Sequence, residues 1–176
     1  MRSKQLSRYT VFALFIIACS QAPTIAAAGG TAKAGLAQAQ EAAHKWKPDA
    51  TLVQVITLSG NVDGTAGKWT YVFHSPEAKR GYQVAVSNGK IVQELGVSVS
   101  FTDPVDLEFV DSAQAVAEAK HNELVVKGDL MMMLLVELKN TKNEGTYWNI
   151  LGDMNAEMSL LINAKTGKFF RKKKFQ

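Results

Sequence analysis

Two stretches of this 176-residue chain have nearly the same layout, and this near-repeat constrains the fold more than any other feature. Each begins with a tryptophan in an aromatic segment and ends at a turn glycine. The first runs from Trp69 to Gly89 and the second from Trp148 to Gly167, spans of 20 and 19 positions. Alternating apolar and polar residues between turn residues are typical of half-buried strands. The sequence therefore predicts two similar antiparallel units.

A helix-like segment precedes each unit. Residues 32–46 carry one narrow apolar stripe that ends at Trp46, and Pro48 stops the helix because the residue before a proline avoids the helical region. Asp111 is a typical N-cap for the second helix. We predict an α+β fold with two tandem α-β-β-β(-β) repeats, in which antiparallel sheets are each packed by one helix. Units of about 60 residues are marginal alone, so we expect the repeats to share a core or join their sheets.

The N-terminal segment has the pattern of an export signal. Three basic residues within positions 1–10 precede a short apolar run at 11–18, too short to span a membrane. The run ends at Cys19, the only cysteine, and residues 16–19 resemble a bacterial lipobox. Cleavage before Cys19 would leave a lipid-modified cysteine and a flexible tether over residues 19–31. Cleavage after Ala28, at an A-x-A site, would instead release a soluble protein. We expect a periplasmic or outer-membrane-associated lipoprotein, or a secreted soluble protein.

The charge of the chain is unevenly distributed. The formal net charge is +4, but three of the positive residues lie in the predicted signal and five lie between Lys168 and Lys174. The body between these segments is near −4. A mildly acidic domain with a basic tip does not have the basic surface of a nucleic-acid-binding protein, so we expect no nucleic-acid partner.

The second unit resembles a PepSY-type domain. The resemblance is carried by Trp148, by the run Ile162-Asn163-Ala164-Lys165-Thr166-Gly167-Lys168, and by an alanine-rich helix that starts at Asp111-Ser112-Ala113. The first unit matches more weakly, with Asn88-Gly89-Lys90 at the equivalent turn, and Asn163 stands where the family usually has aspartate. The predicted elements divide the chain into a signal peptide at 1–18, the tether, repeat 1 at 32–95, a connector at 96–108 and repeat 2 at 109–176, and the resemblance makes both repeats PepSY-like.

A tandem of such units is similar in architecture to the secreted β-lactamase inhibitor protein. PepSY-type domains are associated with the inhibition or chaperoning of peptidases and with cell-envelope proteins. The resemblance therefore implies a role as a binding protein rather than as an enzyme.

Five aromatic residues are candidates for partner binding. They have two interpretations: core between sheet and helix, or anchors on an exposed sheet face, where aromatics commonly contribute most to binding. These residues are Trp69, Tyr71, Tyr82, Tyr147 and Trp148.

Signatures of catalysis and of metal binding are missing from the sequence. The three histidines are isolated, and there is no H-E-x-x-H, P-loop or G-x-S-x-G motif. An acidic run at 103–111 lacks calcium-loop spacing, which favours a solvated connector and helix cap. Met131 and Met133 point opposite to Met132 in a strand, which favours core filling. We expect no enzyme activity, metal or cofactor.

The leading functional hypothesis is an exported, lipid-anchored, non-catalytic protein that binds a protein or peptide across its sheet and inhibits or holds a peptidase or other enzyme. The alternatives are a cell-envelope structural or assembly factor that self-associates, and a small-molecule or lipid binder.

Overall fold

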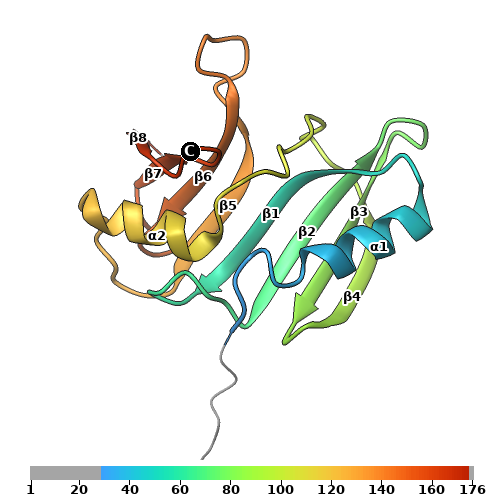
Figure 1. Ribbon diagram of the computed structural model, residues 1–176, viewed down its shortest axis with the longest axis horizontal. Coiled ribbons are helices and arrows are strands. Elements are labelled where there is room, and N and C mark those ends of the chain that lie inside the picture. The colour runs from blue at the N-terminus through green and yellow to red at the C-terminus, as the bar shows by residue number, and fades with distance from the viewer. Residues whose placement is uncertain (1–28, 175–176) are drawn as a thin grey trace, which may run out of the picture.

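The computed structural model describes residues 29–174, which form one eight-stranded antiparallel sheet with two helices on one face (Figure 1). The strand order is β4-β3-β2-β1-β5-β6-β7-β8. The helices are α1 (Leu36–Trp46) and α2 (Ser112–His121). The strands are β1 (Thr51–Gly60), β2 (Lys68–Ser75), β3 (Arg80–Ser87), β4 (Lys90–Val97), β5 (Leu130–Glu137), β6 (Gly145–Leu151), β7 (Met158–Asn163) and β8 (Phe169–Lys174).

The predicted fold class, two tandem repeats that each have a sheet packed by one helix, is wrong. β1 pairs antiparallel with β5, with Val55 opposite Leu134 and Ile56 opposite Met133. This ladder joins the four strands after α1 to the four strands after α2. Two separate sheets would expose two further edges of unpaired backbone groups, and the β1–β5 ladder removes both. The side-chain pattern does not show this pairing, because the backbone groups that form it are present in every residue.

Both helices pack on the same face through small residues. α1 lies against β2 and β3, and α2 lies against β6 and β7. Ala39 and Ala43 of α1, and Ala115 and Ala119 of α2, are fully buried. Because alanines let the helices approach closely, the large side chains of this core come mainly from the sheet. The largest fully buried residues in this cluster are Tyr71, Phe73, Phe109, Leu130, Met132, Leu134, Trp148, Ile150 and Ile162.

The segment before α1 bridges the two halves of the sheet. The Trp69 indole N–H donates to the carbonyl oxygen of Gly30 at 2.8 Å, and the Tyr71 hydroxyl donates to that of Ala32 at 2.7 Å. The Ala32 amide in turn donates to the Ser112 hydroxyl at the start of α2, at 3.0 Å. These bonds tie β2, through the segment before α1, to the start of the second helix.

The connector between β4 and α2 also contacts both halves. The Val105 amide donates to the carbonyl oxygen of Leu52 in β1 at 2.8 Å. The Val110 amide donates to that of Ala164, after β7, at 2.7 Å. The segment thus links the first half of the sheet to the second.

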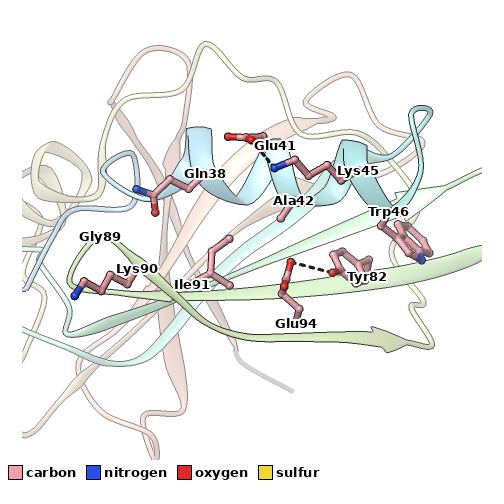
Figure 2. Close-up of a pocket in the computed structure, with 10 residues that line it drawn as sticks. All are labelled: Gln38, Glu41, Ala42, Lys45, Trp46, Tyr82, Gly89, Lys90, Ile91 and Glu94. Carbon is pink, nitrogen blue, oxygen red and sulfur yellow. Dashed lines mark hydrogen bonds and ion pairs between the residues drawn. The ribbon is translucent and has the colours of Figure 1, made fainter.

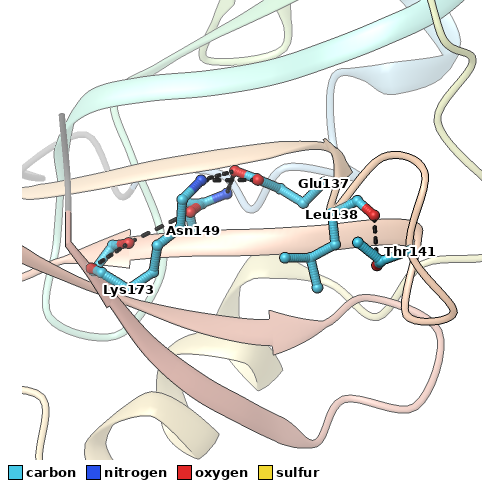
Figure 3. Close-up of polar contacts among 6 residues, drawn as sticks. Glu137, Leu138, Thr141, Asn149 and Lys173 are labelled. Carbon is cyan, nitrogen blue, oxygen red and sulfur yellow. Dashed lines mark hydrogen bonds and ion pairs between the residues drawn. The ribbon is translucent and has the colours of Figure 1, made fainter.

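The second half of the sheet curls away from the helices. β5 and β8 are separated by β6 and β7, yet the Lys173 ammonium lies 2.8 Å from the Glu137 carboxylate (Figure 3). Asn149, between them, donates to Glu137 at 3.0 Å and accepts from Ser159 at 3.4 Å. This polar cluster closes over apolar residues on the helix-free face, which is why they are buried without a covering helix. These residues include Tyr147, Leu151 and Leu161.

Candidate functional site

The main candidate site is a groove of about 730 Å³ between α1 and the β3–β4 edge of the sheet (Figure 2). The helix forms one wall, and the last two strands of the first half form the other. Figure 2 shows Ile91 and Glu94 of β4 projecting toward the helix. The lining residues are Gln38, Glu41, Ala42, Lys45, Trp46, Tyr82, Gly89, Lys90, Ile91 and Glu94.

An aromatic stack closes one end of the groove. The Trp46 and Tyr82 rings are 4.9 Å apart at their centroids and only 9° from parallel. Both are half-buried, so each exposes part of its surface. The Tyr82 hydroxyl donates to Glu94 at 3.0 Å, and burial, followed by the bond to Glu94 and its charge, raises the pKa of Tyr82. The phenol therefore stays protonated at neutral pH and holds Glu94 in place.

The charges around the groove balance. Lys45 and Glu41 form an i, i+4 pair at 2.6 Å on the exposed side of α1, and the hydrogen bond from Lys45 lowers the pKa of Glu41. Lys90 and Glu94 add one charge of each sign. The groove therefore has no net sign that would select a strongly anionic or cationic ligand, and its selectivity must come from shape, apolar contact and backbone hydrogen bonds.

Among residues 29–174, the strand that borders the groove pairs on one side only and forms an open sheet edge. Ile91 is 39 % exposed and Val92 is 57 % exposed. Gln93 pairs with Ala85 and Ile91 with Val86, so Val92 is the extra residue of a bulge. β4 carries only Lys90 and Glu94 as charged residues, whereas the other edge, β8, carries four cations within six residues. Edge charges, lysines above all, and bulges both protect sheets against the addition of further strands. β4 has fewer charges than β8, and its other protective feature is the single bulge at Val92.

The structure separates the five predicted aromatics. Four are buried: Trp69 is 3 % exposed, Tyr147 is 3 %, and Tyr71 and Trp148 are 0 %. Their polar atoms donate to backbone carbonyl oxygens, as in the bond of 2.9 Å from the Trp148 indole to Val110. Only Tyr82 is half-exposed, and it lies in the groove.

Sequence reasoning missed Trp46 as part of a site. The sequence pattern places this residue on the apolar stripe of the first helix, but as the last residue of α1 it stacks on Tyr82 of β3 at the rim of the groove. Local sequence contains no signal for this, because the contact depends on where the helix lies on the sheet.

The other singled-out residues lie elsewhere. Asp111 caps α2 by accepting from the Ser112 amide at 2.8 Å, which confirms the cap interpretation. Met132 is fully buried under the helices, whereas Met131 and Met133 lie on the opposite face. Among residues 29–174, no three histidine, cysteine or acidic side chains converge on a point where a metal could sit.

Two further expectations concern the membrane and the N-terminus. Cys19, the predicted lipidation site, lies outside the described residues, as does the predicted signal segment. No helix within the described part of the chain is long and apolar enough to cross a membrane.

Comparisons with known proteins add no relative. No protein-family model matches the chain, and no match was found among curated proteins or solved structures. The likeness to PepSY-type domains stays a prediction from the sequence.

Proposed function

We propose that this protein is an exported, non-catalytic binding protein that takes an extended segment of a partner protein along β4, beside the groove under α1. The observation that carries the proposal is the open β4 edge. An extended peptide can add to such an edge through backbone hydrogen bonds, and side-chain pockets beside the edge then supply specificity.

The groove supplies such a pocket. Side chains that project from an added strand on the helix side would lie beside Ile91 toward one end of the groove and beside the Trp46–Tyr82 stack at the other. Aromatic surfaces of this kind are common anchors in protein interfaces. The near-zero charge of the lining fits an apolar or aromatic side chain better than an ion.

The proposal keeps the exported setting expected from the N-terminal sequence, with lipid attachment at Cys19 or release as a soluble protein. The resemblance to PepSY-type domains suggests a peptidase or other enzyme that is held or inhibited. Self-association as an envelope assembly factor is the alternative function. It would place a second copy of the chain on the same β4 edge.

The test compares two exposed apolar positions. A photo-cross-linking amino acid replaces either Val92, at the β4 edge, or Leu58, which is 50 % exposed in β1. Each variant is irradiated in the producing cells, and adducts are identified by mass spectrometry. We expect a distinct protein adduct from position 92 and not from position 58.

The partner identified in the adduct is then purified, and its affinity is measured for the unmodified chain and for two variants. Val92→Asp should weaken binding at least tenfold, because it places a charge on the added strand, whereas Leu58→Asp should leave affinity unchanged. Adducts that contain only a second copy of the chain would support self-association instead. Equal adducts from both positions, or none from position 92, would refute the β4 site.

A further inference from the structure

We infer that the β8 edge of the sheet is a docking surface for anionic lipid membranes, separate from the β4 site. The strand order places β8 at one end of the sheet and β4 at the other. A surface that docks on β8 therefore leaves β4 and its groove free. The inference does not depend on the proposed partner binding.

The first argument is the concentration of unpaired positive charge. Residues 168–174 contain five cations and no acidic residue. Within the described part of the chain, Lys172 pairs with Glu123 and Lys173 with Glu137, whereas Lys168, Arg171 and Lys174 form no ion pair. These three side chains are exposed.

The second argument is where these side chains project. Arg171 lies opposite Leu161 in the ladder and Lys174 lies opposite Met158. Residues 161 and 158 are an odd number of positions apart in β7, so Arg171 and Lys174 project on opposite faces of the sheet. Lys168 precedes the strand. When a flat surface lies alongside the edge strand, basic side chains from both faces of the strand can reach it. A lipid bilayer is such a surface.

The third argument is an apolar residue among the cations. Phe170 is 36 % exposed, packs on Tyr147 with centroids 5.4 Å apart, and has the Arg171 guanidinium 5.7 Å from its ring centroid. Basic residues around an exposed aromatic match the chemistry of a headgroup region, where charge and apolar contact both contribute. This combination favours a lipid surface over a soluble polyanion.

The test measures binding of the chain from Gly29 onward, which contains both helices and all eight strands, to sedimenting vesicles. The vesicles contain phosphatidylcholine alone or with an equal part of phosphatidylglycerol. The test variant carries Lys168→Gln, Arg171→Gln and Lys174→Gln. The control carries Lys68→Gln, Lys79→Gln and Lys120→Gln, which removes the same charge from exposed positions elsewhere. Circular dichroism and light scattering establish that every variant is folded and monodisperse.

We expect binding to the anionic vesicles only, weakened by added salt because the attraction is screened. Each basic residue near an anionic surface contributes about fivefold in affinity, so the test variant should bind on the order of a hundredfold more weakly. The control variant should bind within a few-fold of the unmodified chain.

Three results would overturn the inference. The first is an equal loss in the control, which would make net charge the cause. The second is the absence of binding of the unmodified chain to anionic vesicles. If the test variant also aggregates, the basic residues of β8 serve only to protect the sheet edge. The third is equally tight binding to heparin or DNA, which would make the surface a general polyanion site.

Discussion

Replacing Trp148 by phenylalanine should lower the free energy of unfolding of the whole sheet by about 3–5 kcal/mol. Trp148 is fully buried in β6. Its ring makes edge-to-face contacts with Trp69 of β2 at 6.2 Å and with Phe109 of the connector at 6.0 Å. It therefore joins the second half of the sheet to the first.

The magnitude comes from two losses. Phenylalanine has no N–H, so the carbonyl oxygen of Val110 loses the donor that lies 2.9 Å away, at about 1–3 kcal/mol for a buried group left unpaired. The smaller ring also removes the equivalent of two or three buried carbon groups, at about 0.8 kcal/mol each. The remaining ring keeps an aromatic contact with Trp69, so the halves are weakened at their junction without being separated.

The assay is urea unfolding of residues 29–176, followed by far-ultraviolet circular dichroism and by tryptophan fluorescence. Both signals should change together in one transition, because one sheet and one core contain both halves. Trp46→Phe is the matched control. That residue is half-buried and stacks on a single ring, so it should cost no more than about 1.5 kcal/mol.

Three results would refute this reasoning. Two separated transitions, of which Trp148→Phe shifts only the one that belongs to the second half of the sheet, would show that the halves are independent units. A loss below about 1 kcal/mol for Trp148→Phe would show that the buried hydrogen bond and ring contribute little. An equal loss for Trp46→Phe would remove the distinction between junction and rim.

Two further predictions concern buried backbone contacts. Tyr71→Phe should cost about 1–3 kcal/mol in urea unfolding, because a buried carbonyl loses its donor. Burial raises the pKa of Tyr71, so the stability that Tyr71 contributes is present below the ordinary phenol pKa of about 10 and declines as pH rises above that value. Tyr71→Phe should therefore make the loss of stability at high pH shallower. An equally steep loss in the variant would contradict this reasoning. Gly64→Ala should lower the melting temperature more than Gly89→Ala. Both glycines have positive φ, but an added Cβ at Gly64 would lie 2.6 Å from the backbone of Ala113, whereas Gly89 has open space; equal shifts would show that the α2 backbone yields.

Much of the local structure could be predicted from the sequence. The Asn88-Gly89 turn, the Asp111 cap and the alternating strands all depend on residues close together in the chain, whose side chains favour one backbone conformation. For the same reason, the opposite directions of Met132 and its two neighbours follow from strand geometry alone.

The candidate site was much less predictable. Of the five aromatics, the sequence could not distinguish Tyr82, at the rim of a groove, from Tyr71, which is fully buried on the same sheet face. α1 packs on both β2 and β3, but Tyr82 lies toward the β4 edge, where the groove opens between the helix and the sheet. Burial of an alternating residue depends on what lies over the strand, which is a property of the assembled fold.

The sequence by itself determined which segments are strands and helices, because turn geometry, capping and alternation act within a few residues. Only the tertiary structure decided that the two halves form one sheet through β1 and β5, that the second half curls closed through Glu137 and Lys173, and that β4 and β8 are the two edges. The physical reason is that strand pairing uses backbone donors and acceptors that every residue offers, so the choice of neighbour depends on how the whole chain buries its apolar faces.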